Sequence, residues 1–302
     1  MSRNPESLAG VADVNLSGRT AVVTGATSGI GRETALALAR LGADLVVHGR
    51  DAAAGERVVA AAEDVGADAA FLSADFADPV AVDGFADAVR AHTPTVDLLV
   101  NAAGAHFSDG RLVDCGADRA ERTFAVNHLA PFRLTRRLRD VVADDGRVVV
   151  VASRLHRRAD GSFDVRSVDG YDGFAAYCRS KLANVLFADA AAERLDGPAV
   201  ASCHPGFVPG SGLWREASLP VRVAVGALAA LPNVLTPGVV DTAAEAAATP
   251  TWLAASQRQA AIHPGGGYFV DCEPAEPSDV ARDDAVREDL WALSESLTGL
   301  SW

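Results

Sequence analysis

The stretch Thr20-Ala-Val-Val-Thr-Gly-Ala-Thr-Ser-Gly-Ile-Gly31 decides how this chain of 302 residues folds. A short apolar strand at 20–24 ends in a glycine-rich turn, and a helix is predicted directly after it, from Arg32 to Leu41. Glycines permit a tight turn and let backbone N–H groups approach a pyrophosphate at the positive end of a helix. Because the turn joins the first strand to the first helix, it predicts a dinucleotide-binding site. The turn residues expected to contact the dinucleotide are Gly25, Thr27, Ser28, Gly29, Ile30 and Gly31.

Apolar, β-rich runs alternate with helical patterns along the rest of the chain. After the first strand they are 44–48, 69–73, 97–101, 147–152, 199–204 and 267–270. This alternation predicts an α/β fold, a doubly wound Rossmann sheet of about seven parallel strands with helices on both faces. Residues 1–17 are expected to be an N-terminal extension, and 18–302 a single catalytic domain.

One region, about 207–236, departs from this alternation. Its glycines and prolines accompany bulky apolar residues, among them Phe207, Leu213, Trp214 and Leu219, and an apolar run follows from Val221 to Leu231. We interpret the region as a lid over an apolar ligand; the alternative is an ordinary packing helix.

The composition limits the partners. A formal net charge of −13 argues against binding to nucleic acid or to an anionic membrane surface. No run approaches the 18 apolar residues that a membrane span needs, so we expect a cytoplasmic protein. The four cysteines are far apart and the histidines lack metal-ligand spacing, so reduced thiols and no metal site are expected. The acidic charge fits a salt-rich cytoplasm, although the arginine bias equally fits GC-rich coding.

The end of the second strand bears on the choice of nicotinamide cofactor. Gly49 and Arg50 stand where an acidic residue would accept hydrogen bonds from a ribose 2′-hydroxyl. A cation at that place can pair with a 2′-phosphate, so NADP(H) is preferred, NAD(H) remains possible, and Arg50 is the main contact. Arg32 either assists Arg50 in binding the 2′-phosphate or is solvated.

The only lysine of the chain, Lys181, lies four positions after Tyr177. On a helix these positions share one face, so the phenol and the ammonium can point into one pocket, where the cation favours phenolate. The alternative is that one lysine survives by chance in an arginine-biased chain.

Together these residues resemble the short-chain dehydrogenase/reductase family. The motifs, in the order typical of that family, are the turn Thr24–Gly31, Asn101-Ala-Ala-Gly104, Asn127, Ser153, Tyr177-x-x-x-Lys181 and His204-Pro-Gly206. The segments 124–132, 176–187 and 290–295 look like the retinol-dehydrogenase-like branch, which includes the WW-domain oxidoreductase. The chain departs from the pattern at Ala102, where the family usually has asparagine, and we expect none of the membrane anchors that some vertebrate relatives have.

The resemblance implies a role for each matching residue. Tyr177 would be the general acid and base, with its pKa lowered by Lys181 and by the oxidised nicotinamide, and Ser153 would position the substrate oxygen. Lys181 would also hold the nicotinamide ribose, and Asn127 would fix a water next to Lys181. The remaining expected cofactor contacts are Asp75, Asn101, Ala102, Gly104, Pro205, Gly206 and Val208. Asp75 is alternatively an N-cap beside Pro79.

Three neighbours of the catalytic residues are given structural places. Arg154 and His156 are expected at the surface, with contact to the substrate as the alternative, and Cys178 is expected in packing. Ala183, Ala190 and Ala191 form a small-residue face that would permit a homodimer or homotetramer through the helix carrying Tyr177.

We therefore expect an NADP(H)-dependent oxidoreductase that interconverts a hydrophobic alcohol and its ketone or aldehyde. Two alternatives remain open: a reductase of a carbon–carbon double bond or polyketide-type intermediate, and a non-catalytic NADP-binding sensor or scaffold. The sequence does not reveal the substrate, the physiological direction or the stereochemistry.

Overall fold

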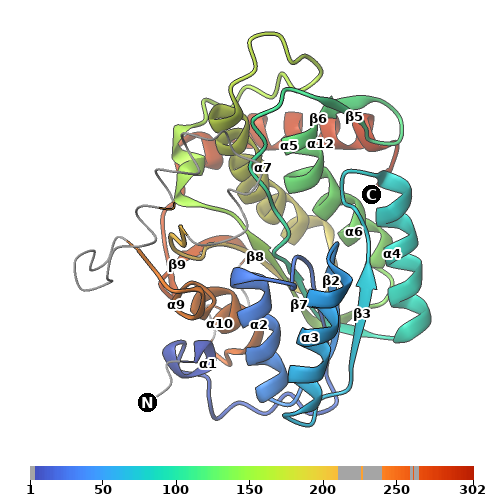
Figure 1. Ribbon diagram of the computed structural model, residues 1–302. Helices are drawn as coiled ribbons and strands as arrows, with labels where there is room; N and C mark the ends of the chain where they lie inside the picture. The colour runs from blue at the N-terminus through green and yellow to red at the C-terminus, as the bar shows by residue number, and fades with distance from the viewer. Residues whose placement is uncertain (1–3, 210–225, 227–239, 259–260, 262–264) are drawn as a thin grey trace.

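An eight-stranded sheet forms the centre of the molecule (Figure 1). The computed structural model describes residues 4–209, 226, 240–258, 261 and 265–302. The strands of the sheet are β1 (Thr20–Val23), β2 (Asp44–Gly49), β3 (Ala69–Ser73), β4 (Val96–Asn101), β7 (Val142–Val151), β8 (Ala199–His204), β9 (Gly266–Val270) and β10 (Glu273–Pro274). They lie in the order β10-β9-β8-β7-β4-β1-β2-β3, and all neighbours are parallel except β9 and β10. The strand order therefore reverses between β1 and β4, the place where such sheets bind ligands.

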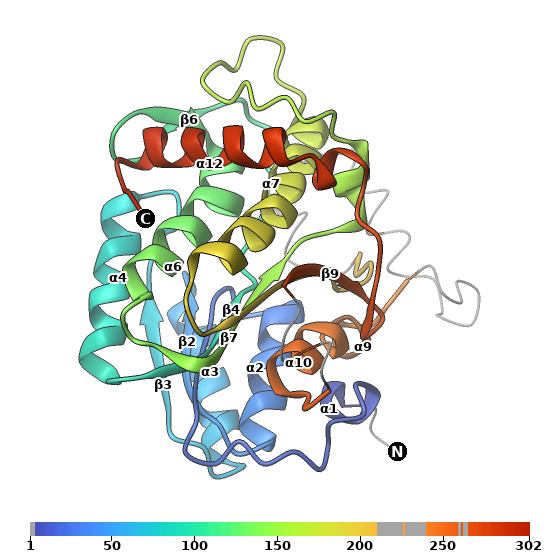
Figure 2. The same ribbon diagram turned by 180° about the vertical axis from the view of Figure 1, so that it is seen from behind.

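Helices cover both faces of this sheet (Figures 1 and 2). The helices described are α1 (Pro5–Leu8), α2 (Gly29–Arg40), α3 (Ala52–Glu63), α4 (Pro79–His92), α5 (Arg122–Phe124), α6 (Ala130–Leu138), α7 (Gly173–Arg194), α9 (Ala243–Ala246), α10 (Ala248–Ala255) and α12 (Asp284–Thr298). One π-helical turn, Ala125–Leu129, links α5 to α6, and 3₁₀ turns lie at Arg154–Arg158 and Val280–Arg282. The helices α2, α3 and α10 pack on one face, and α4, α6 and α7 on the other.

Alternating side chains of each central strand supply the two cores. In β7, Val149 and Val151 belong to the core under α2 and α10, whereas Val148 and Val150 belong to the core under α4 and α6. Because successive side chains of a strand point to opposite faces of the sheet, β7 places valines in both cores. The seven strands predicted from apolar runs are confirmed.

The prediction missed three short strands. The strand β10 adds an antiparallel eighth member at the edge, and β5 (Leu112–Asp114) and β6 (Arg119–Glu121) form a separate hairpin. With only two or three residues each, these strands have no periodicity that a sequence pattern can reveal.

Part of the predicted N-terminal extension packs on the domain. Glu6 of α1 is buried and accepts a hydrogen bond from Nε of Arg40 in α2 at 2.7 Å. Val11 and Leu16 are buried in the same core as α2.

The small-residue face proposed for subunit pairing is covered within the chain. Ala183 shares a core cluster with Leu290 and Leu297 of α12, and Ala190 and Ala191 are fully buried. In Figure 2, α12 crosses over α7 on this side of the molecule. These alanines therefore permit close packing within the chain, which the sequence does not show because it does not reveal that α12 folds back onto α7; the homodimer or homotetramer stays a prediction.

Several expectations fall on other parts of the chain. Of the predicted lid, only 207–209 and 226 are described; Leu213, Trp214, Leu219 and, apart from 226, the run from Val221 to Leu231 lie outside the described residues. No described helix is both long enough and apolar enough to cross a bilayer. Within the same described ranges, no three His, Cys, Asp or Glu residues gather as metal ligands.

Candidate active site

A cavity of about 1050 Å³ lies at the carboxyl ends of the parallel strands. Its lining follows the ends of β1, β2, β3, β4, β7 and β8, which includes the reversal point between β1 and β4. The predicted residues that line it are Gly25, Thr27, Ser28, Gly29, Ile30, Gly31, Arg50, Asp75, Ala102, Gly104, Ser153, Tyr177, Lys181, Pro205, Gly206 and Val208. Two predicted residues, Asn101 and Asn127, lie behind the lining.

The glycine-rich turn has no room for larger residues. Gly25 has φ +65°, and a Cβ there would lie 2.8 Å from the Cα of Ala103. At Gly31 a Cβ would lie 2.5 Å from the carbonyl oxygen of Gly25. The turn is therefore packed tightly against the loop after β4 and against the start of α2, and its residues line the cavity together with the first residues of α2. Such a cradle suits the pyrophosphate of a dinucleotide.

Thr24 ties this turn to the end of β4. Its Oγ1 accepts hydrogen bonds from the backbone N–H groups of Ala102 and Ala103, both at 3.0 Å. The side chain of Asn101 instead turns into the core, where Nδ2 donates to Thr135 at 3.2 Å. Asn101 thus shapes the turn without facing the cavity.

His48, at the end of β2, is a cavity residue that the sequence analysis missed. Its Nδ1 accepts from the N–H of Gly25 at 3.2 Å, and its Nε2 donates to the carbonyl of Ala74 at 3.1 Å. The ring stacks on Phe76 at 3.8 Å between centroids. Burial lowers the pKa of His48 to about 4. The neutral imidazole therefore fastens the glycine turn to the end of β3.

We expect His48 to make the fold sensitive to acid. Below pH 6.5 the unfolded chain gains a proton on this ring, whereas the folded chain gains it only near pH 4. Stability is thus lost as the pH falls through this window, by up to about 1.4 kcal/mol per pH unit. In urea unfolding at pH 7, the His48→Asn variant should have a lower free energy of unfolding than the wild type. The difference between the two free energies should be about 1–3 kcal/mol smaller at pH 4. A gap independent of pH would contradict this role.

Arg50 is exposed and lines the cavity directly after β2. No carboxylate pairs with it among the residues described, whereas Arg32 is bound by Glu33 at 2.6 Å. The neighbouring Asp51 is engaged as the N-cap of α3, accepting from Ala54 N–H at 2.9 Å. Arg32 lies outside the cavity lining and its side chain is 47% exposed, so of its two readings the solvated one is observed.

Asp75 lines the same end of the cavity. Its Oδ1 accepts from the N–H of Ala77 at 3.1 Å, and the N-cap of α4 is Asp78, which accepts from Val80 at 2.9 Å. The alternative that Asp75 caps the helix beside Pro79 was therefore wrong; its carboxylate instead binds the N–H of Ala77 in the cavity lining.

Tyr177 and Ser153 meet at the centre of the cavity. Tyr177 lies in the second turn of α7, and its hydroxyl is hydrogen-bonded to Ser153. Ser153 follows β7 and also caps the 3₁₀ turn, since its Oγ accepts from Leu155 N–H at 3.2 Å. Burial raises the pKa of Tyr177 above its usual value, and the hydrogen bond to Ser153 opposes this rise.

Lys181 lies one turn along α7, on the same face as Tyr177. Its Nζ is 5.7 Å from the centre of the tyrosine ring and donates to the carbonyl of Val151 at 2.9 Å. Burial lowers the pKa of Lys181 to about 8. The prediction that Lys181 lowers the pKa of Tyr177 is not what this structure shows, because desolvation dominates at both groups and the amine is bonded to a strand carbonyl.

Asn127 sits in the π-helical turn and clamps the loop after β4. Its Oδ1 accepts from Ala105 N–H at 2.8 Å, and its Nδ2 donates to the Ala105 carbonyl and to Ser180, both at 3.0 Å. A Cβ at Gly104 would lie 3.4 Å from Asn127 Oδ1 and 3.5 Å from Lys181 Nζ. Asn127 therefore lies close behind Lys181, separated from the cavity by Gly104.

His156 differs most from its prediction. It is fully buried; its Nδ1 donates to the Ser153 carbonyl at 2.7 Å and its Nε2 accepts from Ser278 at 3.0 Å. The surface assignment was wrong because the 3₁₀ turn directs this one side chain inward between exposed arginines. Arg154 is exposed as expected and lines the cavity, and Cys178 is buried in packing.

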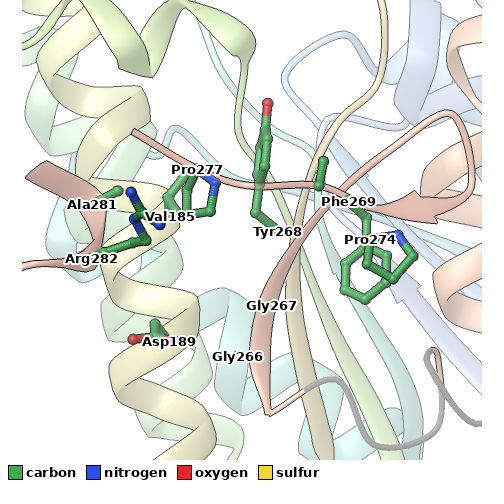
Figure 3. Close-up of a pocket in the computed structure, with 11 residues that line it drawn as sticks. Val185, Asp189, Gly266, Gly267, Tyr268, Phe269, Pro274, Pro277, Ala281 and Arg282 are labelled. Atoms are coloured by element: carbon green, nitrogen blue, oxygen red, sulfur yellow. The ribbon is translucent and has the colours of Figure 1, made fainter. Parts of the chain in front are cut away.

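A second cavity, of about 500 Å³, lies between β9 and α7 (Figure 3). Val185 and Asp189 of α7 and Tyr268 of β9 line it, and none of the predicted site residues does. The ring of Tyr268 packs edge-on against His156 at 4.9 Å, so this pair lies between the second cavity and Ser153.

Comparisons with known proteins show which family the chain belongs to. The family model described as short chain dehydrogenase matches residues 19–218. Dehydrogenase/reductase SDR family member 13 of Bos taurus is 38% identical over 95% of this chain and 74% of its own length. Retinol dehydrogenase 14 of Homo sapiens is 33% identical over 94% and 87%, respectively. A solved structure from Mycobacterium paratuberculosis has a TM-score of 0.72 and 29% identity, and the match covers 96% of this chain and 97% of that one.

These similarities extend over nearly the whole chain, and the glycine turn and the Tyr177–Lys181 pair lie in the matched region. The relatives are dehydrogenases and reductases, which act on CH–OH groups with a nicotinamide dinucleotide. The chain belongs to the short-chain dehydrogenase/reductase family, as an NAD(P)-dependent oxidoreductase that resembles the retinol dehydrogenases.

Proposed function

We propose that this oxidoreductase uses NADP(H) to interconvert a hydrophobic alcohol and its ketone or aldehyde, with Tyr177 as general acid and base. The observation that carries the proposal is the hydrogen bond between Tyr177 and Ser153 in the cavity that also contains the glycine turn. Lys181 lies behind this pair with its amine within the same cavity lining.

The raised pKa of Tyr177 supports the acid role during reduction. Because burial disfavours the phenolate, the hydroxyl is protonated at neutral pH and can donate its proton to a carbonyl oxygen. Ser153 would hold that oxygen next to the phenol. In the reverse direction the phenol must first lose its proton, so alcohol oxidation should become faster as the pH rises.

The residues present fit a phosphorylated dinucleotide. The tight glycine turn at Gly25 and Gly31 would hold the pyrophosphate, and Arg50, which pairs with no carboxylate of the described residues, would face the 2′-phosphate. Lys181 would hold the ribose next to the nicotinamide. When bound, the cofactor supplies or accepts the hydride at the substrate carbon.

Apolar side chains at the catalytic end support a hydrophobic substrate. Phe107, Val126, Leu155 and Phe174 line the cavity on the side of Tyr177. Small-molecule pockets are mostly apolar, with a few polar groups that orient the reacting atoms. The name of the human relative, retinol dehydrogenase 14, also denotes an apolar alcohol.

Purified protein with NADPH and a panel of ketones and aldehydes tests this function. We expect NADPH oxidation with apolar carbonyl compounds and an alcohol as product. A saturated carbonyl product from an unsaturated substrate would instead indicate double-bond reduction. Bound NADPH without any turnover would contradict the proposal.

Replacing Arg50 should change the cofactor preference. In Arg50→Gln, kcat/KM for NADPH should fall about 10- to 100-fold, because a charge-assisted contact to the 2′-phosphate is lost, and kcat/KM for NADH should stay nearly constant. Arg32→Gln is the matched control, since Glu33 already binds that guanidinium. An equal loss with both cofactors would argue against a 2′-phosphate contact.

A further inference from the structure

Phe107, Arg111 and Arg122 form one wall of the cavity at its catalytic end. The wall is attached to the start of α7, because Tyr171 donates from its hydroxyl to the carbonyl of Phe107 at 3.2 Å. A Cβ at Gly173, the first residue of α7, would lie 2.5 Å from that same carbonyl. The wall is therefore anchored at Phe107 to the start of α7, the helix that carries Tyr177.

The guanidinium of Arg122 has unused donors. Its Cζ lies 3.7 Å from the centre of the Phe107 ring, and its Nη2 donates to Asp109 at 2.6 Å. Its Nε is shielded from solvent and has no hydrogen-bond partner among the described residues. A guanidinium carries five N–H donors in a planar fork, and buried donors are normally satisfied.

Arg111 adds a second positive charge to this wall. Its backbone carbonyl accepts from the N–H of Arg122 at 2.9 Å, so the two residues are paired across the wall. Its side chain is exposed to the cavity, and within the described ranges no carboxylate lies at ion-pair distance from it. Asp109, which is 54% exposed, pairs with Arg122 alone, so the charge of Arg111 is not balanced by any described carboxylate.

The positive charge of Arg111 and Arg122 is opposite in sign to the net charge of the whole chain. The chain carries a formal net charge of −13, but the acidic side chains that line the cavity, Asp51 and Asp75, both stand at the end near Arg50. A single guanidinium binds a carboxylate through two parallel hydrogen bonds, so either arginine of this wall can hold an acid group.

We propose that Arg111 and Arg122 form a subsite for a carboxylate of the substrate. The inference rests on the proposed function and narrows it: the substrate is an apolar carbonyl compound or alcohol with an acid group several bonds from the reacting carbon. The apolar segment would lie along Phe107 and Phe174, with the reacting oxygen at Tyr177 and Ser153.

A matched substrate pair tests the subsite: an aliphatic keto acid, with the ketone several carbons from the carboxylate, and its methyl ester. The wild type should prefer the acid over the ester in kcat/KM. In Arg111→Gln this preference should fall about 10- to 100-fold, mainly through a higher KM for the acid, because a charge-assisted contact is lost. Added salt should likewise weaken the preference of the wild type.

Arg119→Gln is the control, because Arg119 belongs to the same hairpin but donates to the Leu112 carbonyl, outside the lining. It should keep the wild-type preference. A wild type that uses the ester as well as the acid, or an unchanged preference in Arg111→Gln, overturns the subsite and leaves the proposed function standing. Absence of turnover with both compounds, despite bound NADPH, would contradict the function itself.

Discussion

Replacing Tyr177 with phenylalanine is expected to lower kcat for carbonyl reduction about 10²- to 10⁴-fold, the range that positioned acid–base groups contribute. The variant removes the proton donor and its hydrogen bond to Ser153 but leaves the glycine turn, Arg50 and Lys181 in place. Binding of NADPH, followed by its fluorescence, should therefore change little. The loss should appear in kcat rather than in KM for the cofactor.

The control is Tyr268→Phe, which removes another buried tyrosine hydroxyl. Tyr268 lines the second cavity and lies outside the active-site lining, so its loss should leave carbonyl reduction near the wild-type rate. A Tyr177→Phe variant that retained the wild-type kcat would show that another group donates the proton.

Replacing Lys181 with methionine should abolish activity and yet stabilise the cofactor-free protein. Burial lowers the pKa of this amine from 10.5 to about 8, so below pH 8 the fold carries the full cost of a desolvated charge. Between pH 8 and 10.5 the unfolded chain binds more protons, so wild-type stability rises with pH in that window. The gain in Lys181→Met should be about 1–3 kcal/mol at pH 7 and should vanish above about pH 10.5.

The Val151 carbonyl keeps a hydrogen-bond donor in Lys181→Met, because Asn184 also donates to it at 3.2 Å. Arg179→Met on the same helix is the contrasting control. Arg179 pairs at 2.8 Å with Glu121, whose carboxylate is fully buried, and removing this partner should destabilise the protein. Urea unfolding at pH 7 and 10 should show a higher free energy of unfolding than the wild type for Lys181→Met at pH 7, and a lower one for Arg179→Met. Destabilisation in Lys181→Met at pH 7 would contradict the account.

The sheet was predictable because its strands are apolar on both faces. Apolar runs such as 147–152 are readily assigned as strands when helical stretches separate them. The glycine turn also showed that the dinucleotide site lies at the end of the first strand. The strand β10 and the β5–β6 hairpin were not predictable, since two or three residues carry no period. The position of α12 over α7 also depends on tertiary packing that no local pattern encodes.

The sequence predicted that Tyr177 and Lys181 lie together, but it did not predict the direction of the pKa shift of Tyr177. Spacing places Tyr177 and Lys181 on one face, yet how deeply each is buried depends on the whole surrounding core, and burial dominates the pKa of both. His48 was missed because a single histidine in an apolar strand resembles any core residue. The only available signal was its place at the end of the second strand, next to Gly49 and Arg50.

A crystal structure with NADPH and an alcohol product bound would test the central claim most directly. We expect the product oxygen within about 2.6–3.2 Å of both the Tyr177 hydroxyl and Ser153 Oγ, with the cofactor running from Arg50 to Lys181. A product oxygen bound to neither side chain, or a dinucleotide lying outside the glycine turn, would contradict it.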